Sequence, residues 1–315
     1  MLDILQRNNS KPTISIRKDI TKLSPEIVDT QRLLDGAILA AWEDAICTKQ
    51  YALPKLTATR WVWRLAGSYH TTHSTPALLR RAAERFVSIG QWDLARWASE
   101  KAVEEQNHDQ LALLDIEAMG HDPITVVENL VPPAARELVD YFSIQVEAAN
   151  PLGVLGYSYT LERLAMRVTD STVENVESIL PKTVNATRCL RTHSSIGADA
   201  DHIKENLEVI ARLSLSEQYS IAISCYETAK MCFTPPEEGH ISEFELQYRL
   251  QSKCQIIDTF QSFSSSTKAL FKKLSTIQQP IFDRKPYPKN VTEQLDYLFY
   301  VQLQDGLPNG IDEAW

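Results

Sequence analysis

Glycine is scarce in this sequence, with only 10 residues among 315. Strict alternation of apolar and polar residues, the pattern of a half-buried β-strand, is almost absent before residue 235, and no internal repeat is visible. Apolar residues make up 43% of the chain and charged residues 23%, which is typical of a globular protein with a sizeable core. These features favour an all-α fold.

The chain also lacks a paired cysteine pattern, an excess of positive charge and a long hydrophobic run. Its five cysteines show no CxxC spacing, so we expect reduced thiols rather than a disulfide framework. The net charge of -9 argues against non-specific binding to nucleic acid or to an anionic membrane. No apolar run reaches membrane-spanning length and no signal peptide is visible, so we expect a cytoplasmic protein without membrane partners.

Helical periodicity predicts a bundle at 30–233, between an N-terminal arm at 1–29 and a C-terminal helix with a polar extension at 234–315. The expected helices cover 30–50, 75–90, 91–120, 133–149, 150–168, 214–233 and a last one at about 241–263. Thr75 is expected as an N-cap and Pro76 as the first helical residue. His70 and His73 in the preceding HTTHS would then lie in a polar loop, where they could line a substrate entrance.

An ionisable pair interrupts the apolar stripe of the helix expected at 91–120. At about 100° per residue, several apolar side chains fall within about 40° of Glu105, namely Leu94, Ala98, Ala112, Ile116 and Met119. His108, three residues later, lies about 60° away on the same side. We therefore expect Glu105 and His108 to point inward together.

The helix at 150–168 has a second inward carboxylate. Glu162 lies at the centre of an apolar stripe that includes Leu155 and Tyr159. Glu147, in the preceding helix, has less clearly apolar surroundings and is a substitute candidate.

A third cluster follows in RTHSSIGADADHIKENLEVIARL (191–213). On a helix that begins at Asp199, the side chains of Asp199, His202 and Asn206 share one face. His193 can join them only if the chain bends or starts a new helix near Gly197, where glycine makes a break easier.

Three carboxylates and three imidazoles from three segments have the composition expected of a dinuclear iron or manganese site in a helical bundle. Metal binding would also explain why these charges tolerate an apolar setting. Taken singly, an inward glutamate is more often paired with an arginine, and Arg96, Arg163 and Arg191 are available. A single inward histidine is more often bonded to a carbonyl.

Together these residues resemble the haem-oxygenase-like dimetal oxidases, a family of iron-containing redox enzymes related in fold to thiaminase II and pyrroloquinoline-quinone synthase. The resemblance covers roughly residues 60–232 and rests on EEQNHDQLALLDIEAMG, on GYSYTLERLA and on HSSIGADADH. The family's last motif commonly reads H-x3-D-x2-H, whereas six positions separate His193 from Asp199 here.

The resemblance implies a haem-oxygenase-like helical bundle that binds two Fe(II) ions, or iron with manganese. The implied ligands are Glu105, His108, Glu162, His193, Asp199 and His202. The implied activity is an O2-dependent oxidation of a small molecule such as an amine, an amino acid or a fatty acid. The resemblance also implies a homodimer.

Two alternatives stay open. One is a metal-free enzyme of the same fold, such as a thiaminase-like hydrolase with a cysteine nucleophile or a cofactorless oxidase. Cys189 and Cys225 are available for it, although their expected role is core packing. The other is a non-catalytic interaction protein on a helical scaffold, which predicts no buried cluster of acids and histidines.

Overall fold

The structure is a computed structural model that describes residues 24–48, 54–192, 199–234 and 241–251. These residues form helices and no strand, which confirms the all-α class for the described part of the chain. The helices are α1 (Pro25–Thr48), α2 (Ala58–Ser88), α3 (Trp92–Glu104), α4 (His108–Ala118), α5 (Pro123–Asn129), α6 (Pro133–Glu147), α7 (Gly153–Ala165), α8 (Asp170–Ile179), α9 (Arg188–Thr192), α10 (Asp199–Ile210), α11 (Leu215–Phe233) and α12 (Glu243–Gln251).

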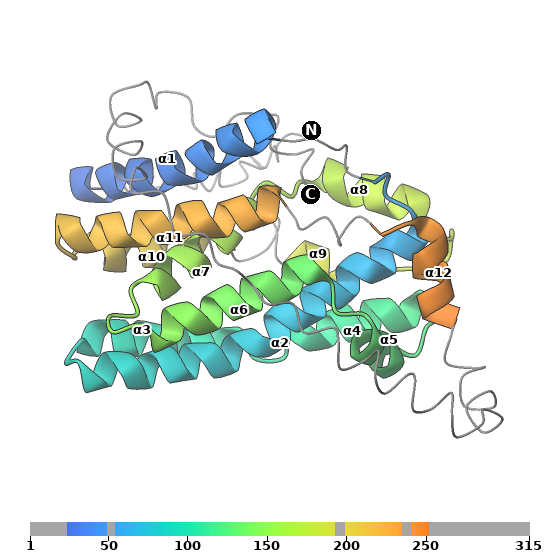
Figure 1. The fold of residues 1–315 in the computed structure, drawn as a ribbon, viewed down its shortest axis with the longest axis horizontal. Coiled ribbons are helices and arrows are strands. Elements are labelled where there is room, and N and C mark those ends of the chain that lie inside the picture. Colours follow the sequence, from blue (N-terminus) through green and yellow to red (C-terminus); the bar gives the residue numbers. More distant parts are fainter. Residues whose placement is uncertain (1–23, 49–53, 193–198, 235–240, 252–315) are drawn as a thin grey trace, which may run out of the picture.

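Helix α2 spans the length of the molecule and joins its two ends (Figure 1). Its 31 residues correspond to about 46 Å of helix at about 1.5 Å per residue. The C-terminal half of α2 contributes to a core shared with α1, α3, α6, α7, α10 and α11. Its N-terminal half belongs to a second core shared with α4, α5, α8, α9 and α12. The bundle therefore has two hydrophobic centres connected by one continuous helix.

Helices α7 and α11 pack closely at Gly156, in the larger core. A Cβ atom at Gly156 would lie against the carbonyl oxygen of Ile221 and 2.7 Å from the Cβ of Ser224. The Ser224 hydroxyl donates to the carbonyl oxygen of Gly153 at 2.7 Å, across the same contact. A glycine at this position lets the two helices approach each other along their backbones.

A charged network joins α1 to α7 inside this core. Arg163 donates through Nε and Nη2 to the two carboxylate oxygens of Asp35, at 2.9 and 3.1 Å. The hydroxyl of Tyr159, which is fully buried, donates to the same carboxylate at 2.9 Å. All of these contacts have hydrogen-bonding geometry. The charges of Asp35 and Arg163 are therefore paired by directed hydrogen bonds, which fix one arrangement of the two side chains.

The helix expected to start at Thr75 in fact starts at Ala58 and continues through Pro76. The expected N-cap at Thr75 and the expected loop at 70–74 are therefore wrong. The hydroxyls of Thr71, Thr72, Ser74 and Thr75 donate to backbone carbonyls three or four residues earlier in the same helix. These hydrogen bonds within the helix let a polar run remain helical. The sequence did not reveal them, because a run rich in serine and threonine is typical of a loop.

The single helix expected at 91–120 is divided into α3 and α4. Helix α3 ends at its C-cap, Glu105, and Asn107 has a φ of 67° in the left-handed region. Asparagine is one of the few residues other than glycine that adopts this conformation readily. The expected stripe is divided by this turn, because Leu94 and Ala98 belong to the larger core while Ala112 and Ile116 belong to the smaller one.

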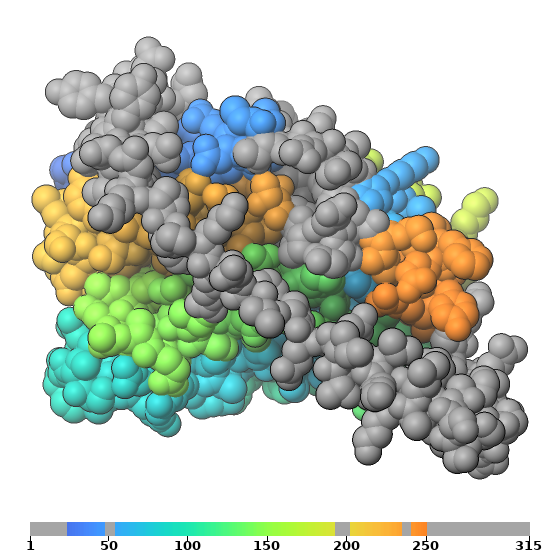
Figure 2. All heavy atoms as spheres, in the orientation of Figure 1, coloured from blue at the N-terminus to red at the C-terminus, as the bar shows by residue number. Residues whose placement is uncertain are grey.

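The other expected helices agree with α1, α6, α7 and α11, although α1 begins at Pro25, inside the expected arm. Short helices α5, α8 and α9 were not predicted. Helix α12, the described part of the last expected helix, lies against the N-terminal half of α2 (Figure 2). Its Leu246 is buried in the smaller core. No helix in the described ranges is long and apolar enough to cross a membrane.

Replacing Asp35 with asparagine should lower the free energy of unfolding by about 3 kcal/mol, because Arg163 would keep a buried charge without its partner. Urea denaturation followed by circular dichroism measures this loss. The matched control is Asp29→Asn, since Asp29 is 68% exposed and pairs with an exposed Arg32, and such a pair contributes less than about 1 kcal/mol. Equal effects of both substitutions would contradict a structural role for the buried network.

Gly156→Ala should destabilise the protein by about 2 kcal/mol or more, because the added methyl group forces α7 and α11 apart. Thermal denaturation checks this prediction against Gly67→Ala in α2. The nearest atom to a Cβ at Gly67 is Cγ of Pro132 at 3.5 Å, an ordinary contact. The control should therefore be neutral or gain up to about 1 kcal/mol from helix propensity.

Candidate carboxylate and histidine site

A lysine lies at the centre of the predicted site. Lys101, on α3, has a side chain that is only 3% exposed, and its Nζ lies 2.9 Å from Glu104 Oε2. The same Nζ lies 3.7 Å from Glu162 Oε1 on α7 and 3.5 Å from Glu205 Oε2 on α10. Three helices thus bring carboxylates to one ammonium group inside the bundle.

The charge state of Lys101 follows from these contacts. Burial by itself would lower the pKa of the ammonium group, but the negative charges of Glu162, Glu104 and Glu205 together outweigh it. The pKa therefore lies above its ordinary value and Lys101 stays protonated. A protonated lysine is not a nucleophile, which argues against Schiff-base chemistry at this residue.

Glu162 is held by a chain of hydrogen bonds on its other side. The side-chain amide of Asn206, on α10, donates to Glu162 Oε2 at 2.6 Å, and the indole of Trp97, on α3, donates to the amide oxygen of Asn206 at 2.7 Å. Asn206 is fully buried, and the Glu162 side chain is 11% exposed. The prediction that Glu162 points inward is confirmed by this burial, and its orientation is fixed by neighbours on α3 and α10.

His202 lies beside the same group of carboxylates. Its Nε2 is 3.6 Å from Glu104 Oε2, so the two groups form an ion pair when the imidazole is protonated. Glu104 is therefore in contact with both Lys101 and His202. Asn206 and His202 lie on one face of α10, as expected from their spacing.

Glu105 and His108 are brought together at the turn between α3 and α4. Oε2 of Glu105 lies 2.9 Å from Nδ1 of His108, and the two side chains are 16% and 22% exposed. The pair spans the break between α3 and α4, where Asn107 has a φ in the left-handed region, so the two residues do not belong to one continuous helix. A carboxylate bound to Nδ1 fixes the orientation of an imidazole ring, a common arrangement behind metal-binding histidines.

The hydroxyl of Tyr157, on α7, is buried and has no hydrogen-bond partner within the described part of the chain. Its ring stacks on Phe142 with centroids 4.2 Å apart. Burial, with the charges of Cys232 and Glu105, raises the pKa of this phenol, so it remains neutral. The hydroxyl is therefore a neutral hydrogen-bond donor without a partner among the described residues.

Two of the six predicted ligands cannot be placed. His193 lies outside the described residues, and Asp199 is described only as the first residue of α10. Oxygen and nitrogen donors suit Fe(II) and Mn(II). Among the side chains that the structure describes, however, no three of histidine, cysteine, aspartate or glutamate form a group able to hold a metal ion. With Lys101 beside Glu162, the described donors as arranged do not fit a pair of metal ions.

The other candidates lie apart from this group. The Glu147 side chain is 55% exposed and pairs with Arg81 at 2.8 Å. His70 is bonded through Nε2 to the carbonyl oxygen of Leu130 at 3.0 Å, and His73 contacts Asp109 at 2.7 Å. These contacts are the ordinary structural roles of such residues.

The arginines offered as counterions bind elsewhere. Arg163 pairs with Asp35, Arg191 with Glu177, and Arg96 with Asp93. Glu162 forms an ion pair instead with Lys101, which periodicity did not single out.

The buried thiols are poor nucleophiles. Burial raises the pKa of Cys189 to about 12 and that of Cys225 to about 12, so neither forms a thiolate readily near neutral pH. Cys225 is fully buried between α7 and α11, where its thiol donates to the carbonyl oxygen of Gly156. Core packing is the role that this environment supports.

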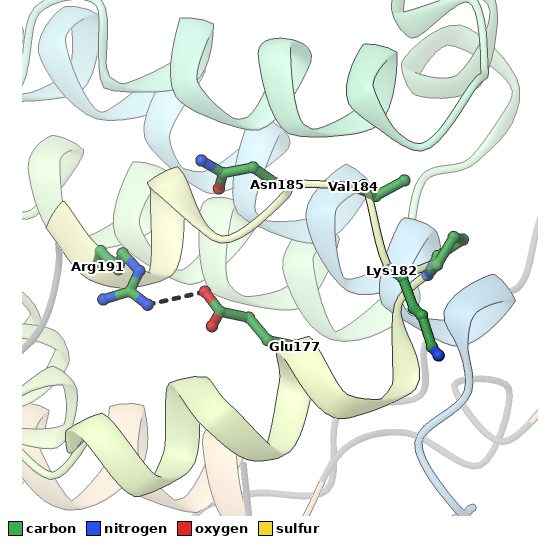
Figure 3. A pocket seen from close by; sticks show the side chains of 6 residues that line it. Glu177, Lys182, Val184, Asn185 and Arg191 are labelled. Atoms are coloured by element: carbon green, nitrogen blue, oxygen red, sulfur yellow. Dashed lines mark hydrogen bonds and ion pairs between the residues drawn. The ribbon is translucent and has the colours of Figure 1, made fainter.

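A surface hollow of about 410 Å³ lies between α8 and α9 (Figure 3). Glu177 and Arg191 form an ion pair of 2.8 Å across it, and Lys182 points away from that pair. None of the predicted ligands that the structure describes lines this hollow. It is therefore separate from the carboxylate group around Lys101.

Comparison with known proteins adds one structural similarity. No family model matches the chain, and no curated protein matches it. One crystal structure, of a domain of unknown function with a haem oxygenase-like fold from Shewanella denitrificans OS217, covers 83% of this chain and 95% of its own. The two are 18% identical and superpose with a TM-score of 0.48. This comparison says nothing about activity.

Replacing Asn206 with leucine should destabilise the protein by about 1–3 kcal/mol, because the buried indole N–H of Trp97 and the Glu162 carboxylate would each lose a partner. Chemical denaturation measures the loss, and the fluorescence of the tryptophans reports the changed surroundings of Trp97. Asn129→Leu is the control, since Asn129 is exposed and bonds only within α5. An Asn206→Leu variant as stable as the control would contradict the Trp97–Asn206–Glu162 chain.

Proposed function

We propose that this protein is an O2-dependent non-haem di-iron oxidoreductase with a haem-oxygenase-like fold, which oxidises a small molecule. The observation that carries the proposal is the convergence of Glu104, Glu162 and Glu205 inside the bundle, around a position that the Lys101 ammonium occupies. An enclosed position surrounded by carboxylates from three helices favours a cation there. The resemblance in sequence at Glu105, Glu162 and His202 supports iron as that cation.

The chain's own residues would act by orienting groups and excluding water. Asn206 and Trp97 hold the Glu162 carboxylate, and Glu105 holds the His108 ring. Bound Fe(II) would supply the electrons that reduce O2. The apolar walls of α3, α7 and α10 would keep bulk water from the reaction.

A metal-free enzyme of the same fold is the second candidate, and Lys101 favours it. Its ammonium already neutralises charge beside Glu162, so the cluster does not need a metal for electrostatic balance. The raised pKa values of the buried Cys189 and Cys225 thiols argue against a hydrolase with a cysteine nucleophile. The remaining metal-free alternative is a cofactorless oxidase. A cytoplasmic location and a homodimer stay predictions.

Anaerobic reconstitution with Fe(II), followed by exposure to O2, tests the proposal. The protein should bind about two iron ions per chain and oxidise them faster than a protein-free iron solution. Iron content by elemental analysis and O2 uptake at an electrode are the two measurements. Glu162→Ala should lose at least about tenfold in the rate of iron oxidation, because a carboxylate that would help to hold the iron is removed.

The matched control is Glu147→Ala, which removes an exposed carboxylate on the neighbouring helix α6 and should keep wild-type iron binding. Wild-type behaviour of Glu162→Ala would remove Glu162 from the site. Absence of iron binding by the wild-type protein would favour the metal-free enzyme or the interaction protein instead.

A further inference from the structure

Two arginines near the start of α2 are buried beside the smaller core. Arg60 is 6% exposed and Arg64 is partly buried, and their spacing of four residues places them on one face of the helix. The Arg60 guanidinium donates to the carbonyl oxygen of Ile241 at 2.6 Å. Within the described ranges, Arg64 makes no side-chain hydrogen bond, and neither arginine forms an ion pair with a carboxylate.

The positive charges of the two arginines act on each other. Burial lowers the pKa of Arg64, and the charge of Arg60 lowers it further. Burial also lowers the pKa of Arg60, against the opposing charge of Glu243, whose carboxylate accepts a hydrogen bond from Thr57. A guanidinium group nevertheless stays protonated in a protein. Its charge is costly to bury without an opposite charge, so this face of α2 favours an anion.

The start of α6 adds a further positive group. Helices α2 and α6 lie side by side and run in the same direction (Figure 1). A Cβ at Gly67 would lie 3.5 Å from Pro132, just before α6, and Arg81 pairs with Glu147 at the end of α6. Arg64 therefore lies roughly one helical turn before the level at which α6 begins. No side chain caps this helix start, so its first N–H groups and the positive end of its dipole favour an anion at the same level.

We propose that Arg60, Arg64 and the start of α6 form a binding site for the carboxylate or phosphate group of a small organic anion. Guanidinium groups bind such oxyanions through paired N–H donors. The buried neighbours Trp61 and Trp63 make the surroundings apolar, which suits an apolar body on the ligand. Binding here requires neither iron nor the carboxylates around Lys101, so the inference goes beyond the proposed function.

Titration of the full-length protein with inorganic phosphate, and separately with octanoate, tests the site by isothermal calorimetry. The wild type should bind at least one of these probes, and the comparison distinguishes a phosphate from a carboxylate ligand. Arg64→Met should raise the dissociation constant at least about tenfold, because the buried oxyanion loses a charged donor. Arg64→Lys keeps the charge without the planar set of donors, so its affinity should lie between those of Arg64→Met and the wild type.

Thermal denaturation separates ligand binding from a structural role of Arg64. In buffer without either probe, Arg64→Met should have a Tm at least equal to that of the wild type, because an uncompensated charge is removed. The rise in Tm that the bound probe causes in the wild type should be lost in this variant. Sodium chloride at the same ionic strength is the control for general screening and should not reproduce the rise.

Arg80→Met is the charge-matched control. Arg80 lies on α2 and is exposed, so its removal changes the net charge equally at a screened position. The dissociation constant of this variant should stay within about twofold of the wild-type value.

An equal loss of affinity in Arg80→Met, or wild-type affinity in Arg64→Met, would overturn the inference. A lower Tm of Arg64→Met without a probe would overturn it as well, because a carboxylate of the chain would then already pair with Arg64. Binding of neither probe by the wild type would also overturn it. None of these results changes the outcome expected for iron binding, so the proposed function would fail or stand separately.

Discussion

The enclosed ammonium of Lys101 is the constraint on which the arrangement of α3, α7 and α10 depends. Burying a lysine charge costs several kcal/mol unless opposite charges surround it. Glu104, Glu162 and Glu205 provide them, one from each of these helices. The helices must therefore keep a spacing that satisfies Lys101. Asn206 reinforces this spacing by joining Glu162 on α7 to Trp97 on α3.

A second charged group in the same bundle shows what a purely structural network looks like. Asp35 receives two hydrogen bonds from Arg163 and one from Tyr159, all between 2.9 and 3.1 Å. The planar guanidinium fits the carboxylate in one geometry and fixes α1 against α7. Lys101 has more carboxylates around it but no hydrogen bond of normal geometry to a described residue. The Lys101 ammonium is therefore kept in place by surrounding charge, which depends weakly on angle.

The all-α class and most long helices could be predicted, because apolar residues repeat with helical period in α1, α6, α7 and α11. The inward position of Glu162 followed from the same period. The turn at Asn107 could not be found this way, since an asparagine inside a helical pattern gives no signal until its φ is known. Lys101 was missed because a lysine near an apolar stripe normally extends its charge to water. Its burial depends on carboxylates of α7 and α10, which are distant in sequence.

Diffraction from crystals soaked in Mn(II), recorded at a wavelength where manganese scatters anomalously, tests the central claim most directly. The account predicts an anomalous peak beside the Glu162 carboxylate. No anomalous peak at this carboxylate would contradict the account.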